Sequence, residues 1–245
     1  MIRFVKNILR SLKTKWLMFK ADSIRKKNQI NNPDFKCNAN TKRCFYNEQS
    51  PYYHYEYFGE NTPVCCATHL YTILHDVTRV LETEEVEYFI SFGTLLGAVR
   101  HGGLIPWDTD TDILIAETDK QRVISILRDK LPSQYVVSED RDKKISGSII
   151  RVNFSEINTL HVDLFTYLVE NDEIVFGHDR RFVKKDIFPL QKIVFYDLDL
   201  PAPRNIEKQL RTFYDENYMK YAYKQWALDK TKFVITDYAP AKIEV

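Results

Sequence analysis

The sequence predicts an α+β domain in which a mixed sheet is flanked by helices. Apolar residues with helical spacing alternate along the chain with apolar segments of strand length. A glycine-containing turn, Gly93-Thr94, follows one predicted strand, and three aspartates at alternating positions run into another at residues 113–115. With 245 residues, 44% of them hydrophobic, the chain is long enough for one large domain with an appendage.

The formal net charge of the chain is only +1, so it has no global basic field of the kind that marks a nucleic-acid-binding protein. We therefore expect no nucleic-acid partner. No apolar run approaches the roughly 20 residues that a membrane-spanning helix needs.

Residues 1–27 combine many basic side chains with apolar residues at helical spacing, among them Leu12, Trp16 and Phe19. This pattern predicts a basic amphipathic helix that lies on an anionic membrane surface or packs on the domain itself. Residues 28–245 are expected to form the catalytic domain. The expected location is the cytoplasm, in peripheral contact with a membrane, or the Golgi lumen if the N-terminus acts as an unusual anchor.

Four cysteines lie in the first third of the chain, within a segment of irregular composition. Six residues separate Cys37 from Cys44, and twenty residues separate Cys44 from the adjacent pair Cys65 and Cys66. Four thiolates can bind one tetrahedral Zn²⁺. Two disulfides, which need an oxidising compartment, and four unrelated thiols are the competing interpretations.

The elements follow in order from Pro63. A helix is predicted over residues 70–81, a strand over 86–92, and a short helix over 94–100 whose N-terminus offers backbone N–H groups to a phosphate. Arg100 and His101 lie where they can reach the same phosphate, or they face solvent.

The second half of the chain is predicted to complete the sheet. A helix begins after Asp119, strands cover residues 148–154 and 160–168, and shorter strands lie near 174–176 and 193–195. A further helix is expected over 205–214, and the tail from Tyr221 shows no clear period.

The acidic run Asp108-Thr-Asp-Thr-Asp112 is the centre of the predicted site. Alternate residues of a strand face the same side, so an extended backbone projects Asp108, Asp110 and Asp112 together. Like charges at this spacing repel, and Mg²⁺ or Mn²⁺ relieves the repulsion through hard oxygen ligands. An exposed acidic turn is the alternative.

Asp163 lies inside the apolar strand 160–168, where a carboxylate needs a partner. We predict that Asp163 joins Asp110 and Asp112 as the third metal ligand; an aspartate bonded to a neighbouring strand is the alternative. Asp163 or Asp108 is the expected general base. The residues alone indicate metal-dependent phosphoryl or nucleotidyl transfer.

The segment GTLLGAVRHGGLIPWDTDTDI resembles the signature of the LicD/fukutin family of phosphotransferases. This resemblance implies a nucleotidyltransferase-like fold, Mg²⁺ (or Mn²⁺), and substrate contacts from Gly93, Thr94, Arg100 and His101. It also implies that residues 37–66 form a zinc loop that takes part in oligomer contacts, with Arg43 beside the second cysteine as a phosphate contact.

The same resemblance implies an activity. Such enzymes move a phospho-alcohol from a CDP-activated donor to a glycan hydroxyl and release CMP, as in cell-surface polysaccharide synthesis. The cysteine loop favours ribitol phosphate over phosphocholine as the transferred group. The alternatives are a nucleotidyltransferase that acts on RNA or a small molecule, and a non-catalytic zinc-stabilised binding module.

Overall fold

The computed structural model describes residues 34–44, 61–140, 149–176, 180–223 and 232–244, together with nine single positions between residues 12 and 27. Most of the predicted amphipathic helix 1–27 lies outside the described residues; the described positions within it are helical and exposed. None of the helices in the described ranges combines the length and apolar character that crossing a membrane requires.

A mixed sheet forms the centre of the domain, as predicted. Its main strands run in the order β1 (Tyr88–Ile90), β2 (Asp110–Ala116), β5 (His161–Glu170), β4 (Ile149–Asn153) and β3 (Val136–Asp140). Only β2 and β5 are parallel; the other neighbours in this order are antiparallel. The far end of β5 continues into a hairpin with β6 (Glu173–Phe176), which pairs with β7 (Arg180–Val183).

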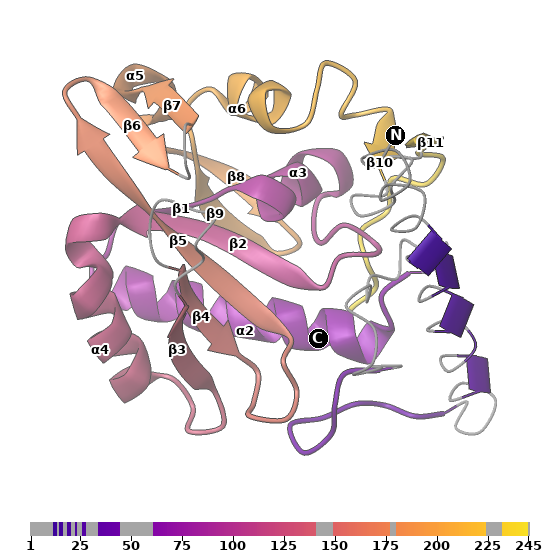
Figure 1. The fold of residues 1–245 in the computed structure, drawn as a ribbon. Coiled ribbons are helices and arrows are strands. Elements are labelled where there is room, and N and C mark those ends of the chain that lie inside the picture. The colour runs from indigo at the N-terminus through magenta and orange to yellow at the C-terminus, as the bar shows by residue number, and fades with distance from the viewer. Residues whose placement is uncertain are drawn as a thin grey trace, which may run out of the picture.

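Helices cover the sheet (Figure 1). The long helix α2 (Val64–Thr83) contacts β2, β5 and α4 (Lys120–Lys130), which follows the short 3-10 helix η2 (Glu117–Asp119). On the other side, α3 (Phe92–His101) contacts β2 and α6 (Ile206–Phe213). The remaining elements are the short helix α5 (Lys184–Ile187), the antiparallel pair β8 (Gln191–Phe195) and β9 (Leu198–Ala202), and the antiparallel pair β10 (Tyr221–Tyr223) and β11 (Lys232–Val234).

The apolar stripe of α2 explains why the helix lies against the sheet. Leu70, Ile73, Leu74, Val77 and Leu81 recur at three- and four-residue spacing, and all of them are fully buried. Burying a side chain of this size contributes about 1.5–3 kcal/mol. The helix is therefore fixed by its packing and provides a rigid base for the strands above it.

Residue 241 is hydrogen-bonded to the loop that leads to β2. The Ala241 N–H donates to the Leu104 carbonyl at 3.0 Å, and the Tyr196 hydroxyl donates to the Ala241 carbonyl at 2.6 Å. Room for the Tyr196 ring exists because residue 103 is glycine: a Cβ there would lie 2.6 Å from the ring. The approach to the acidic run is thus held from two sides.

Candidate active site

The site begins where β1 turns into α3. Ser91 is extended and Phe92 has a φ of +44°, so the chain reverses sharply and brings Gly93 against the aspartates of β2. A Cβ at residue 93 would lie 2.9 Å from Asp108 Oδ2 and 3.3 Å from Asp112 Oδ2. Glycine is required here because the backbone approaches the two carboxylates too closely for any side chain.

Asp112 is held by this turn. Its Oδ2 accepts a hydrogen bond from the Gly93 N–H at 3.0 Å, and its own N–H donates to the Thr94 hydroxyl oxygen at 2.7 Å. Burial, followed by the charges of Asp110 and Asp108, raises the pKa of Asp112 well above its usual range. A bound cation would reverse this shift, so the site suits a metal ion chemically.

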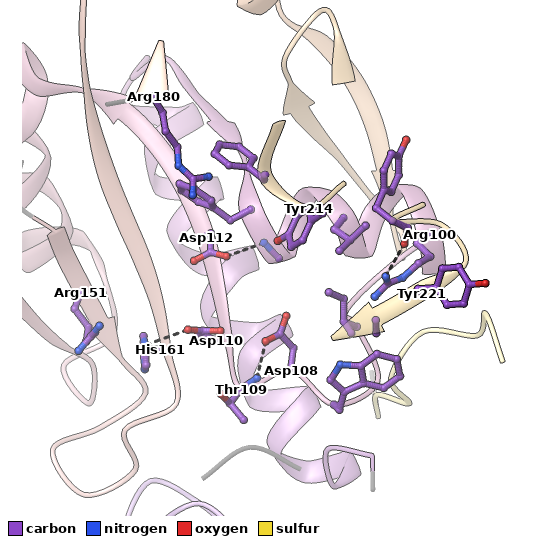
Figure 2. Close-up of a pocket in the computed structure, with 18 of the residues that line it drawn as sticks. Arg100, Asp108, Thr109, Asp110, Asp112, Arg151, His161, Arg180, Tyr214 and Tyr221 are labelled. Carbon is purple, nitrogen blue, oxygen red and sulfur yellow. Dashed lines mark hydrogen bonds and ion pairs between the residues drawn. The ribbon is translucent and has the colours of Figure 1, made fainter. Parts of the chain in front are cut away.

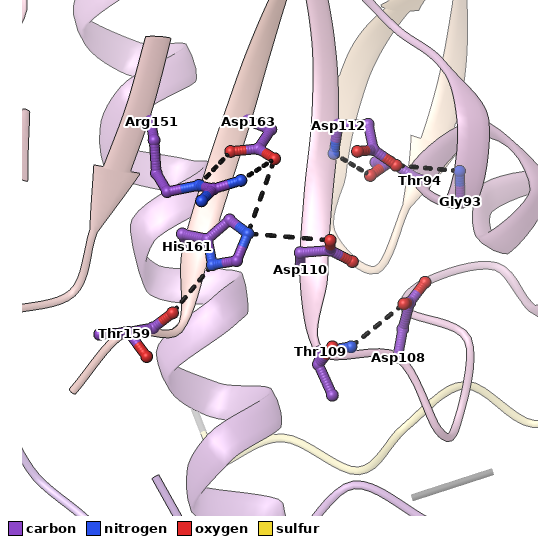
Figure 3. A network of polar contacts seen from close by, with 10 residues as sticks. All are labelled: Gly93, Thr94, Asp108, Thr109, Asp110, Asp112, Arg151, Thr159, His161 and Asp163. Carbon is purple, nitrogen blue, oxygen red and sulfur yellow. Dashed lines mark hydrogen bonds and ion pairs between the residues drawn. The ribbon is translucent and has the colours of Figure 1, made fainter. Parts of the chain in front are cut away.

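Asp163 lies directly opposite Asp112 in the register of β5 and β2, but their carboxylates diverge (Figure 3). Asp163 turns toward Arg151 of β4, whose Nε donates to Oδ1 at 2.7 Å and whose second nitrogen donates to Oδ2 at 2.8 Å. The buried carboxylate is therefore bonded to a neighbouring strand. The same carboxylate lies within 4.8 Å of ligand atoms of Asp110 and His161, whereas Asp112 is outside this group.

Asp108 lies at the end of the loop before β2. Its Oδ1 accepts from the Thr109 N–H at 3.1 Å, and its carbonyl accepts from the Thr62 hydroxyl at 2.6 Å. Asp108, Asp110 and Asp112 all face one cavity of about 670 Å³ (Figure 2). The structure thus brings the three aspartates of the acidic run together along one wall.

Arginines surround the aspartates. Arg43, Arg100, Arg151 and Arg180 all line the cavity and come from four separate parts of the chain. The Arg180 guanidinium of β7 stacks over Phe213 at 4.5 Å, and burial lowers its pKa. A cavity with an acidic wall and several guanidinium groups suits a phosphate ester that is bound together with a divalent cation.

Aromatic side chains supply half of the remaining lining residues. They are Phe92, Trp107, Phe213, Tyr214, Tyr218 and Tyr221. Burial, followed by the charge of Asp112, raises the pKa of Tyr214 well above its usual range, so its phenol stays protonated beside the carboxylates. Flat rings of this kind can stack against a nucleobase.

Arg100 and His101 occupy the last turn of α3, where positive charge interacts favourably with the helix dipole. Arg100 lines the cavity and donates to the Tyr218 carbonyl at 2.9 Å. His101 does not line the cavity; it is buried and accepts from Arg100 Nε at 2.9 Å. Burial and the charge of Arg100 lower the pKa of His101 to about 4, so a neutral imidazole supports Arg100 from behind.

Thr94 also differs from its expected role as a direct substrate contact. Its side chain is buried and binds the backbone of Asp112 rather than lining the cavity. Of the five residues expected to touch substrate, Gly93, Arg100 and Arg43 line the cavity, and Thr94 and His101 lie behind it.

The four cysteines come together as one cluster. The Sγ atoms of Cys37 and Cys66 are 3.4 Å apart, and those of Cys44 and Cys65 are 3.2 Å apart. All four sulfur atoms lie within 4.8 Å of one another. Four thiolates around one Zn²⁺ at about 2.3 Å per bond require separations close to these, and contacts with the other three thiols lower the pKa of Cys37.

The cysteine cluster is joined to the sheet and to the cavity. The His69 ring of α2 binds the Cys37 carbonyl at 2.8 Å and stacks on Phe154 at 4.1 Å. Ser155, just after β4, donates to the Ala39 carbonyl at 2.6 Å. Arg43, next to Cys44, reaches the cavity from this loop.

Sequence reasoning missed several residues of the site. Four residues that line the cavity belong to no local sequence motif: His161, Arg151, Arg180 and Tyr214. Long-range strand pairing and the end of α6 bring them to the cavity. His161 alone left a signal: it lies two residues before Asp163 on the same strand, and alternation places both on one face.

A strand, a glycine turn and an aspartate-bearing second strand define this region as a nucleotidyltransferase-type domain. Residues 85–205 match the family described as the LicD/FKTN/FKRP nucleotidyltransferase domain. The chain belongs to this family through that domain.

The chain is 34% identical over 185 residues to the human protein named ribitol 5-phosphate transferase FKRP, covering 72% of this chain and 37% of that one. It is 33% identical over 82 residues to lipopolysaccharide cholinephosphotransferase LicD of Haemophilus influenzae, covering 33% of this chain and 31% of that one. The chain thus spans about a third of the length of these relatives. Among solved structures, a lincomycin-bound lincosamide antibiotic adenylyltransferase aligns with a TM-score of 0.44 and 15% identity, covering 65% of this chain and 92% of that one.

Proposed function

We propose that the protein is a metal-dependent phosphotransferase that transfers a phospho-alcohol from a CDP-activated donor to a glycan hydroxyl and releases CMP. The observation that carries this proposal is the single cavity in which Asp108, Asp110 and Asp112 face several arginines. The family and the names of the two relatives support phospho-alcohol transfer. The four-cysteine cluster favours ribitol phosphate over phosphocholine as the transferred group.

In this reaction the acceptor oxygen bonds to the phosphorus that carries the alcohol. The bond between that phosphorus and the bridging oxygen of the diphosphate breaks, and CMP leaves. Asp108 is the proposed base that takes the proton of the attacking hydroxyl, because Asp163 already accepts two hydrogen bonds from Arg151. Arg100 and Arg180 hold the phosphate oxygens, and the aromatic lining holds the cytosine.

Asp110 and Asp112 are the proposed ligands of Mg²⁺ (or Mn²⁺), joined by Asp163. When bound, the cation supplies neutralisation of the charge on the donor's phosphates. The raised pKa of Asp112 supports this assignment, because the carboxylates repel one another without a cation.

The proposed function is tested by measuring CMP release from CDP-ribitol and from CDP-choline in Mg²⁺ with glycan acceptors supplied. We expect turnover of at least one donor, and loss of that turnover in Asp110→Asn. The preferred donor then identifies the transferred alcohol. If neither donor is turned over, the donor class is wrong, and a nucleotidyltransferase or a binding module becomes the better hypothesis.

We also propose that Cys37, Cys44, Cys65 and Cys66 hold a structural Zn²⁺. The separations of their sulfur atoms, 3.2–3.7 Å where they are in contact, support a shared metal over cross-links. Elemental analysis of the purified protein should find one zinc per chain. A Cys66→Ser variant should lose it, and a disulfide on mass analysis without reduction would overturn the assignment.

A peripheral membrane contact through residues 1–27 belongs to the same proposal. Leu12, Trp16 and Phe19 are exposed and share one side of a helix, and lysines flank them. Sedimentation with anionic vesicles, and its loss in Trp16→Glu, is the test. We also propose that the protein acts at the cytoplasmic face of the membrane and forms a homo-oligomer.

A further inference from the structure

We propose that His161, Asp110 and Asp163 form a mixed nitrogen–oxygen site for a transition-metal cation such as Mn²⁺. This site shares Asp110 and Asp163 with the proposed Mg²⁺ site and adds His161 as a nitrogen ligand. The inference deepens the proposed function and rests on it only for the purpose that the cation serves.

The sheet places the three side chains together. Asp110 is the register partner of His161 across the parallel β2–β5 pair, and Asp163 follows two residues later on the same face of β5. One ligand atom from each lies within 4.8 Å of the others. Figure 3 shows one nitrogen of the His161 ring facing the carboxylates of both Asp110 and Asp163.

The hydrogen bond that His161 makes on the side away from the carboxylates determines the tautomer of its ring. Nδ1 lies 2.8 Å from the Thr159 carbonyl, which can only accept, so Nδ1 carries a hydrogen. In the neutral ring Nε2 then holds a lone pair. This lone pair faces Asp110 Oδ2 at 3.8 Å and Asp163 Oδ2 at 3.6 Å.

Three electron-rich atoms therefore converge at separations that are too long for direct hydrogen bonds. A cation between them satisfies all three at once. The backbone carbonyl that orients His161 is the usual outer partner of a metal-binding histidine. Arg151 orients Asp163 in the same way, because its two charged hydrogen bonds fix the Asp163 carboxylate. The Oδ2 atom of Asp163 keeps a lone pair for a cation.

The ligand set also indicates which cation binds. An imidazole nitrogen suits transition-metal cations, whereas Mg²⁺ prefers oxygen alone; Mn²⁺ shares the carboxylate preference of Mg²⁺ and is the transition-metal probe for this site. The cysteine cluster offers sulfur ligands, which select softer ions, so added Mn²⁺ should report on the cavity and not on the cysteines.

The experiment is electron paramagnetic resonance of Mn²⁺ bound to the protein as purified, with electron spin echo modulation to detect a directly bound ¹⁴N nucleus. We expect nitrogen coupling in the wild type. It should vanish in His161→Gln, with Mn²⁺ bound about tenfold or more weakly, a loss in line with one ligand or its supporting partner. His75→Gln, which changes a partly exposed histidine on α2, should keep both the coupling and the affinity.

Two results would overturn the inference: Mn²⁺ bound in the wild type without nitrogen coupling, or coupling that persists in His161→Gln. Circular dichroism of each variant establishes that it is folded. The measurement needs no donor or acceptor, so its failure is separate from that of the proposed function. CMP release without nitrogen coupling rejects this inference alone, and coupling without CMP release rejects only the donor class.

Discussion

Arg151 of β4 and Asp163 of β5 are register partners joined by two hydrogen bonds, at 2.7 and 2.8 Å. Asp163 is almost fully buried, whereas the Arg151 side chain is 30% exposed toward the cavity. This pair neutralises one carboxylate of the site from within the fold. The aspartates of β2 still repel one another, as the raised pKa of Asp112 shows.

Arg151→Gln should lower the free energy of unfolding by roughly 2–4 kcal/mol, because it leaves a buried carboxylate without its charged partner. The double variant Arg151→Gln/Asp163→Asn should recover part of this loss, since no buried charge remains. Urea unfolding at neutral pH measures both. Equal stability of the two variants would show that the partner's charge is not the source of the loss.

Gly93→Ala should reduce turnover by at least about tenfold with little change in unfolding free energy. Its Cβ would meet the carboxylates of Asp108 and Asp112 and displace them from the cavity wall. Gly102→Ala is the matched control, because a Cβ there meets nothing within 4 Å. At a φ of +73° this control should cost about 1 kcal/mol of stability and leave turnover unchanged.

Arg180→Gln should raise the KM for the donor about tenfold or more, because a charged hydrogen bond to phosphate contributes about 1.5–3 kcal/mol. The neighbouring Arg181 is the control: its guanidinium pairs with Glu170 and Glu173 at 2.9 Å, and it does not line the cavity. Arg181→Gln should leave KM unchanged. Steady-state kinetics with varied donor compares the two, and equal effects would remove Arg180 from the proposed phosphate contacts.

The pH dependence of stability should contain a contribution from His101. Its pKa is lowered from 6.5 to about 4 in the folded chain, so the unfolded chain binds the proton more tightly. The contribution of His101 to the free energy of unfolding is fully present above about pH 6.5. It falls as the pH drops toward 4, by about 1.4 kcal/mol per pH unit. His101→Gln keeps an acceptor for Arg100 but should flatten this slope. Urea unfolding at several pH values tests it; an unchanged slope would contradict it.

Much of the fold could be predicted from local pattern. The stripe of α2, the buried β1, and the acidic entry to β2 each show their periodicity within a few residues, and all three elements form where expected. The predicted helix after Gly93-Thr94 is present but begins earlier, at Phe92, because the turn uses a positive φ at that residue.

The elements that sequence reasoning missed have weak patterns. β7 consists of Arg180, Arg181, Phe182 and Val183, and α5 is four residues long, so neither has an apolar period of its own. The ion pair between Arg151 and Asp163 depends on a strand register that no local motif encodes. The carboxylates of the cavity, together with Arg43 and Arg100, could therefore be predicted from the sequence, whereas Arg151 and Arg180 could not.

The fastening of the Leu104 region by Ala241 has a consequence for synthesis of the chain. The acidic run is made early, yet some of the hydrogen bonds that hold its approach come from residues 196 and 241, which are made later. A ribosome that has translated only as far as α6 therefore carries a domain whose sheet can form but whose cavity is unfinished. We expect the approach to the cavity to be completed only when residue 241 docks, in a late step that follows the formation of the sheet.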